Sequence, residues 1–160
     1  MQTTSKLIIQ KEQPAIVILV SDEYIRHYLY NLCKKLNYHP QIASDVKDLV
    51  KKLKKLHNGI AFVDHKAVIS HGSRIYRIIN IASPSSKVIL LFDRANRRLV
   101  KGAMKAGVYA CIMAPYKEWE VFMIIREIFA TQQAKRKKNF SKCPTTFSVD
   151  SLQKCSFKPY

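Results

Sequence analysis

Two acidic residues lie where their carboxylates could act together on a metal ion. The apolar segment of residues 60–63 ends on Asp64, and Asp22 follows the apolar segment of residues 14–20. A carboxylate at the end of a buried strand costs free energy unless a partner satisfies it. Clustered carboxylate oxygens bind hard cations, so Asp22 and Asp64 are candidate Mg²⁺ ligands. The alternatives are a hydrogen-bonded structural carboxylate at Asp64 and a helix N-terminal acid at Asp22.

Placing these carboxylates together requires a sheet, and the apolar pattern predicts one. The segments expected to form strands are residues 14–20, 39–44, 60–64, 87–92 and 108–113. The segments expected to form helices are residues 22–36, 44–58, 73–82, 93–107 and 116–138, with a loop over residues 65–72. Strands and helices alternate five times, which predicts an open parallel sheet with helices on both faces. Ligands of such sheets bind beyond the carboxyl ends of the strands.

Length and composition favour a single domain. The 160 residues are close to half apolar, but no apolar run is long enough to span a membrane. The first residues lack the apolar core of a secretory signal, and the four cysteines have no metal-ligand spacing. No nucleophile–base pair or cofactor-binding loop is visible. We therefore expect a cytoplasmic protein that is not an enzyme and has no membrane partner.

The formal net charge of +17 is the unusual feature of the composition. Such a charge attracts nucleic acid or anionic lipid non-specifically, although a merely solubilising surface has the same count. The apolar pattern stops near Gln132. We expect residues 1–13 to be an N-terminal extension and residues 132–160 to be a basic, mostly disordered tail. The cluster that could contact nucleic-acid phosphates in this tail is Lys135, Arg136, Lys137 and Lys138.

The order of the motifs resembles the receiver domain of two-component response regulators, which has a flavodoxin-like fold. "ILVSDE" is similar to the acidic motif after the first strand, and Gly72 follows Asp64 at the family's spacing. "KVILLF" and "GAMKAGVYACIMAPY" are similar to the fourth strand and to the segment that ends the fifth. The resemblance covers residues 14–131. It implies a doubly wound (βα)5 parallel sheet with strand order 2-1-3-4-5.

The resemblance implies a role for each acidic residue at the strand ends. Asp64 occupies the phosphoacceptor position of the family, and Asp22 fits one of its two metal-binding acids. Ser21 stands where the other acid is expected, so Glu23 could supply the second one. His65, beside Asp64, could be a general acid, but a loop histidine is usually solvated. On this basis Mg²⁺ is a possible cofactor of Asp22, Glu23 and Asp64, but not a required one.

Three other positions depart from the family pattern. Phe92 stands where the family has Thr or Ser, Ala114 where it has Lys, and Cys111 where it has Tyr or Phe. A lysine contact to a phosphoryl group is worth about 1.5–3 kcal/mol, and alanine offers none of it. We therefore expect an atypical receiver that acts as a regulatory protein-interaction module without phosphorylation. The alternatives are a phosphorylatable receiver of a two-component system, modified on Asp64, and a nucleic-acid-associated protein that uses the basic surface.

The resemblance also implies a face for a protein partner or a homodimer. In the family this face is formed by the fourth helix, the fifth strand and the fifth helix, which correspond here to residues 93–107, 108–113 and 116–138. Arginine together with aromatic residues is typical of interaction hot spots, whereas the alternative is an ordinary solvated helix surface. The residues expected on the face are Arg94, Arg97, Arg98, Lys101, Lys105, Tyr109, Lys117 and Trp119.

Overall fold

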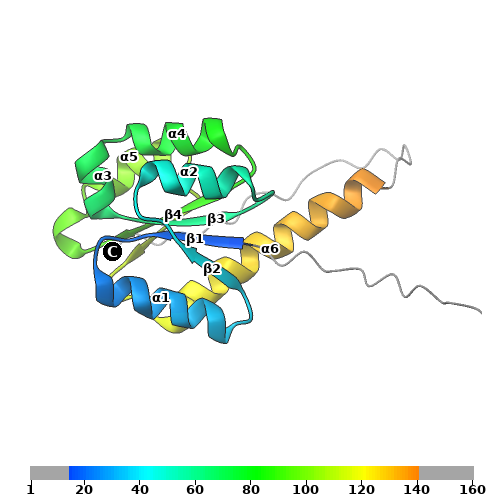
Figure 1. Cartoon of the computed structure of the whole chain (residues 1–160), viewed down its shortest axis with the longest axis horizontal. Helices are drawn as coiled ribbons and strands as arrows, with labels where there is room; N and C mark the ends of the chain where they lie inside the picture. The colour runs from blue at the N-terminus through cyan, green and yellow to red at the C-terminus, as the bar shows by residue number, and fades with distance from the viewer. Residues whose placement is uncertain (1–14, 141–160) are drawn as a thin grey trace, which may run out of the picture.

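The computed structural model describes residues 15–140, which form a five-stranded parallel sheet with helices on both faces (Figure 1). The strands are β1 Ala15–Leu19, β2 His39–Ile42, β3 Ile60–Asp64, β4 Lys87–Phe92 and β5 Ala110–Met113. The helices are α1 Glu23–Lys35, α2 Val46–Lys54, α3 His65–His71, α4 Arg74–Ala82, α5 Leu99–Lys105 and α6 Glu118–Phe140, with a single 3-10 turn at Arg94–Asn96. The strand order β2-β1-β3-β4-β5 confirms the predicted sheet.

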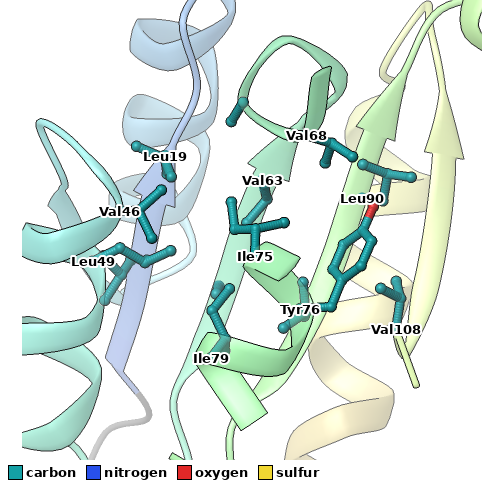
Figure 2. Close-up of a cluster of buried hydrophobic side chains, with 14 of the residues drawn as sticks. Leu19, Val46, Leu49, Val63, Val68, Ile75, Tyr76, Ile79, Leu90 and Val108 are labelled. Atoms are coloured by element: carbon teal, nitrogen blue, oxygen red, sulfur yellow. The ribbon is translucent and has the colours of Figure 1, made fainter. Parts of the chain in front are cut away.

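The core lies on both faces of the sheet because the central strands are apolar throughout. Alternate residues of β1 point to opposite faces, so Ile16 and Val17 belong to different buried clusters. Helices α1 and α6 cover one face, and α2, α3, α4 and α5 cover the other (Figure 1). The buried cluster that contains Val17 packs α2 and α4 against β1, β3 and β4, and it includes the ring of Tyr76 (Figure 2).

Two segments between the strands differ from the sequence-based prediction. Residues 65–72, expected to be a loop, contain helix α3, because the Asp64 carboxylate accepts a hydrogen bond from Ala67 N and begins the helix. The helix expected over residues 93–107 is divided. Asp93 accepts hydrogen bonds from Asn96 N and Nδ2, which close a 3-10 turn before α5 begins.

The last helix follows the prediction of a helix over residues 116–138, since α6 spans Glu118–Phe140. Residues 132–140 were also assigned to the mostly disordered tail, and that part of the tail prediction is wrong because they are helical. Gln, Ala, Lys and Arg are all good helix formers, which explains a helix without an apolar stripe. The rest of the predicted tail and the N-terminal extension at residues 1–13 lie outside the described residues. Within residues 15–140, none of the helices has both the length and the apolar character needed to cross a membrane.

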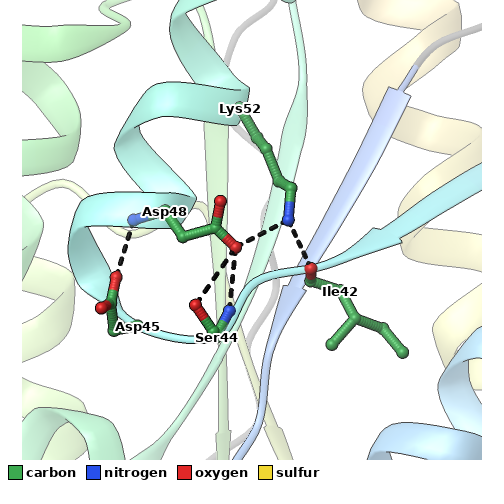
Figure 3. Close-up of polar contacts among 5 residues, drawn as sticks. All are labelled: Ile42, Ser44, Asp45, Asp48 and Lys52. Atoms are coloured by element: carbon green, nitrogen blue, oxygen red, sulfur yellow. Dashed lines mark hydrogen bonds and ion pairs between the residues drawn. The ribbon is translucent and has the colours of Figure 1, made fainter.

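A polar network fixes the start of α2 beside the edge strand β2 (Figure 3). Asp45 caps the helix by accepting a hydrogen bond from Asp48 N at 2.7 Å. One carboxylate oxygen of Asp48 accepts hydrogen bonds from Ser44 N at 3.0 Å and from Lys52 Nζ at 2.6 Å. Lys52 also donates to the carbonyl oxygen of Ile42 at 2.6 Å. The network therefore ties the end of β2 to the second turn of α2.

The Asp48 network predicts a pH-dependent part of the stability. The hydrogen bond from Lys52, followed by the one from Ser44 N, lowers the pKa of Asp48. A carboxylate with a lowered pKa stabilises the fold above the ordinary aspartate pKa, and this contribution is lost as the pH falls through the lowered value. Asp48→Asn should therefore reduce the free energy of unfolding at neutral pH and flatten its acid limb, measured by urea unfolding between neutral and acidic pH. Lys52→Met should act in the same direction, and an acid limb unchanged in both variants would contradict the prediction.

Candidate functional site

Asp64 is a buried carboxylate with both oxygens hydrogen-bonded to the backbone. It ends β3, and 4% of its surface is exposed. Its Oδ2 accepts a hydrogen bond from Ser21 N at 2.8 Å, and its Oδ1 accepts one from Ala67 N at 3.0 Å. The first bond joins the loops that follow β1 and β3, and the second caps α3. This geometry satisfies the buried charge without a metal or a ligand, which is the structural role considered for Asp64 from the sequence.

Asp22 and Glu23 lie at the start of α1. Asp22 is the N-cap residue, and its Oδ1 accepts a hydrogen bond from Ile25 N at 3.0 Å. Glu23 is the first helical residue and is exposed. Among residues 15–140 no three His, Cys, Asp or Glu side chains are arranged to hold a metal ion. Within these described residues, Asp22, Glu23 and Asp64 are thus not grouped as the expected Mg²⁺ ligands, and Asp22 and Asp64 cap α1 and α3.

Three more polar side chains gather at the carboxyl ends of the strands. Asp93 follows β4, and its Oδ2 lies 3.6 Å from Nε2 of His65. His65 begins α3 and is mostly buried, with its Nδ1 left without a hydrogen-bond partner, so the expectation of a solvated histidine is wrong. Tyr116 follows β5 and is partly buried. Burial, and then the nearby carboxylates of Asp93, Asp64 and Asp22, raise its pKa to about 12.

The site is therefore a compact group of three carboxylates, one imidazole and one phenol at the carboxyl end of the sheet. Asp93 and Tyr116 begin the two segments expected to form helices after the fourth and fifth strands, but neither was given a role from the sequence. Their strand-end positions were the available signal. The arrangement can hold protons and bind polar groups, but the oxygens of Asp64 that a phosphoryl donor would have to reach already accept two backbone hydrogen bonds.

Solved structures that are similar to the chain share its fold. A CheY-like response regulator receiver domain protein from Methanospirillum hungatei JF-1 is 20% identical, with a TM-score of 0.68, over 77% of this chain and 98% of that one. The signal receiver domain of an HD domain-containing protein from Pseudomonas fluorescens Pf-5 is 22% identical, with a TM-score of 0.67, over 76% and 98% of the two chains. A response regulator from Thermotoga maritima is 18% identical, with a TM-score of 0.64, over 74% and 98%.

The chain has the fold of a response-regulator receiver domain. No protein-family model matches the chain, and no curated protein matches it either. The likeness therefore rests on the arrangement of the strands and helices. The roles of individual residues have to be judged from their own surroundings.

The positions that depart from the receiver pattern lie around the carboxyl ends of β4 and β5. Phe92 is buried, and its carbonyl oxygen accepts a hydrogen bond from Ala114 N at 2.8 Å. Ala114 precedes Pro115 through a cis peptide bond. Cys111 lies on β5, where its Sγ is 3.7 Å from Sδ of Met104, and burial raises the pKa of its thiol to about 11. Neither a hydroxyl nor an ammonium group is supplied at Phe92 or Ala114.

All the residues predicted for the interaction face lie between the end of β4 and the first turn of α6, around the edge strand β5. Whether they form one binding surface stays a prediction. Tyr109 precedes β5, whereas Trp119 follows it, so these two aromatic residues lie toward opposite ends of the strand. Lys87 Nζ lies 6.0 Å from the centre of the Tyr109 ring. Three exposed methionines in this region, Met104, Met113 and Met123, were not predicted from the sequence.

The predicted nucleic-acid contacts of the tail lie on the last turns of α6. Lys135 and Lys137 are exposed there, and the side chains of Arg136 and Lys138 lie outside the described ones. The end of α6 that carries them extends away from the sheet (Figure 1). Whether the cluster binds nucleic acid stays a prediction.

Proposed function

We propose that this chain is a receiver-fold protein-interaction module that acts without phosphorylation of Asp64. The observation that carries the proposal is the double use of the Asp64 carboxylate, which caps α3 and holds the loop after β1. Phosphorylation would turn one of these acceptor oxygens into the bridging oxygen of an acyl phosphate, a weaker acceptor that carries a bulky phosphoryl group, and would sacrifice a backbone hydrogen bond. The absence of a cation at Ala114 and of a hydroxyl at Phe92 removes the groups that would stabilise and report the modified state.

We propose that the partner docks on the exposed apolar residues around β5. This docking face consists of Met104, Met113, Trp119 and Met123. Trp119 is 63% exposed, which is unusual for the largest apolar side chain of the protein, and tryptophan is the residue most enriched in binding hot spots. Methionine is flexible and polarizable, so it adapts to the shape of a partner.

The charge around the docking face favours an acidic protein over a second copy of this chain. The exposed cations near it are Arg94, Arg98, Lys101, Lys105 and Lys117. Glu118 is the exposed acid beside them, and it is paired with Lys35 Nζ at 2.8 Å. Two copies that met through this face would place like charges together, whereas an acidic rim on a partner would be attracted to it.

The proposal predicts that a phosphoryl donor will not modify or switch the protein. Incubation of the full chain with acetyl phosphate and Mg²⁺ should give no lasting mass increase, and beryllium fluoride should leave the sedimentation coefficient unchanged. Intact-mass spectrometry and sedimentation velocity make these measurements. A stable adduct on Asp64, absent from Asp64→Asn, together with a shift to a dimer would instead establish the phosphorylatable receiver.

The docking face is tested with variants that keep the fold. The double variant Trp119→Ser with Met113→Ser should no longer bind the acidic partner. The variant Ile69→Ser, which changes an exposed apolar residue on α3, should still bind it. Lys101→Glu with Lys105→Glu should also weaken capture if the partner is acidic. A wild-type dimer that the Trp119 and Met113 changes dissociate would show that the occupant is a second copy, and would contradict the acidic partner.

A further inference from the structure

Helices α2 and α4 end at the same edge of the molecule. Both return antiparallel to the strands, and they pack side by side on one face of the sheet (Figure 1). Their last turns therefore lie at the amino ends of the strands, opposite the site built around Asp64. The loops that follow them touch, because Asn58 N donates a hydrogen bond to Ser85 Oγ at 3.4 Å.

The extended end of α6 leaves the domain from this same edge. Gln132 Nε2 donates a hydrogen bond to the carbonyl oxygen of Asn58 at 3.3 Å, which places α6 beside the loop after α2. Beyond this contact the helix projects away from the sheet (Figure 1). Its next turn carries the exposed side chains of Lys135 and Lys137. Three segments distant in sequence thus meet at one end of the protein.

Charge is distributed unevenly along these helices. The acidic residues of α2 are in its cap and first turn, at Asp45 and Asp48, whereas its exposed end carries Lys51, Lys54 and Lys55. Helix α4 contains no acid at all. The acids of α6, which are Glu118, Glu120 and Glu127, all precede Gln132. Lysines in a last turn also complement the helix dipole, which acts on Lys51 and Lys54 of α2 and on the final turn of α6, whereas Lys135 precedes that turn.

Two isoleucines are exposed on α4, the helix that packs against the lysine-rich α2. Ile81 is 72% exposed and Ile78 is 43% exposed, and both are in the second half of α4. Neither packs into the core, which receives Ile75 and Ile79 from the other side of the helix. Single exposed aliphatic side chains are ordinary on a protein surface, but here two of them lie on one helix that packs against a second helix rich in lysine.

We propose that this basic end binds the surface of an anionic lipid bilayer. The basic end is defined by Lys51, Lys54, Lys55, Ile78, Ile81, Lys135 and Lys137. Lysines attract anionic headgroups, and aliphatic side chains gain by entering the boundary between headgroups and acyl chains. Nucleic acid would use the same lysines for its phosphates, but unpaired bases stack on aromatic rings and draw no benefit from Ile78 and Ile81.

The proposal is independent of the docking face, which lies around β5. A protein bound to a bilayer through its basic end would keep the Asp64 site at the opposite end directed away from the lipid. The sequence analysis predicted no membrane partner because it found no span. Binding to the bilayer surface requires only a basic and apolar patch, and this patch forms only when α2, α4 and α6 are brought together.

Vesicle co-sedimentation of the full chain tests the proposal. The protein should sediment with phosphatidylcholine vesicles that contain phosphatidylglycerol, but not with phosphatidylcholine alone, and high salt should release it. Each lysine near an anionic surface contributes about a fivefold gain in partitioning, so Lys54→Gln with Lys55→Gln should weaken binding about 25-fold. Lys47→Gln with Lys66→Gln removes the same charge at the opposite end and should change binding little.

The isoleucines distinguish a lipid surface from other anions. Ile78→Ser with Ile81→Ser should weaken vesicle binding, while Ile69→Ser on α3 should not, and circular dichroism should show all variants folded. If the Lys47→Gln, Lys66→Gln variant lost as much vesicle binding as the Lys54→Gln, Lys55→Gln variant, net charge alone would attract the vesicles. That result would overturn the proposal. Retained vesicle binding in the isoleucine variant, with tight duplex DNA binding that depends on Lys54 and Lys55, would assign the surface to nucleic acid instead.

Discussion

Asp64→Ala is expected to lower the free energy of unfolding by about 3 kcal/mol. The change removes the acceptors of two backbone hydrogen bonds, from Ser21 N and Ala67 N, in a place where only 4% of the residue is exposed. Hydrogen bonds to a charged group contribute about 1.5–3 kcal/mol each, and the loss of an N-cap costs about 0.5–2 kcal/mol. The bond from Ala67 N is itself the N-cap bond of α3, so the hydrogen-bond and capping contributions overlap. We therefore take about 3 kcal/mol as a central value. Urea unfolding followed by circular dichroism measures it.

Two related variants separate the role of Asp64 from a general capping effect. Asp64→Asn keeps one acceptor oxygen, but its amide nitrogen cannot accept from the second N–H, so about half of the loss should remain. Asp22→Ala removes a single N-cap bond, to Ile25 N, and should cost about 1 kcal/mol. A stability gain in Asp64→Ala would contradict a structural role, since functional carboxylates are often retained at a cost to stability.

The sheet was predictable from the sequence, but its strand order was not predictable from periodicity alone. The continuous apolar runs of residues 14–20 and 60–63 indicate strands buried on both faces, and their alternation with helices indicates a parallel sheet. Nothing in such a pattern says which strands are neighbours. The order came from the resemblance to receiver domains, and the structure confirms it.

The candidate site could be predicted only in part from its residues taken one at a time. Asp64 was placed correctly at the end of a buried strand, but its hydrogen bonds depend on Ser21, which is distant in sequence, and on a short helix that carries no periodic signal. The exposed methionines were missed for a similar reason. Met113 is an apolar residue of a type usually found in the core, and it is exposed because β5 is an edge strand.

Tyr76 presents the opposite case to Asp64, since it is a buried polar group without a partner. Its residue is 2% exposed, and its hydroxyl oxygen has no hydrogen-bond partner (Figure 2). An unsatisfied buried donor costs about 1–3 kcal/mol of desolvation, and an apolar group of similar shape does not bear this cost. Tyr76→Phe should therefore raise the free energy of unfolding at neutral pH by about 1–2 kcal/mol, which is measurable by urea unfolding.

The same substitution should change the alkaline limb of stability. Burial, followed by the nearby Cys111, raises the pKa of Tyr76 to about 12. The unfolded chain releases this proton near pH 10, about two units earlier, so the wild-type protein loses stability as the pH rises from about 10 to 12. Tyr76→Phe has no proton to lose and should be less sensitive in this interval, although Tyr116 keeps part of the dependence in both proteins. Tyr24→Phe, on a residue that is 82% exposed, is the control and should match the wild type at neutral pH. If Tyr76→Phe were destabilised at neutral pH, the hydroxyl must have a partner that stabilises it, and the gain in stability predicted for its removal would be wrong.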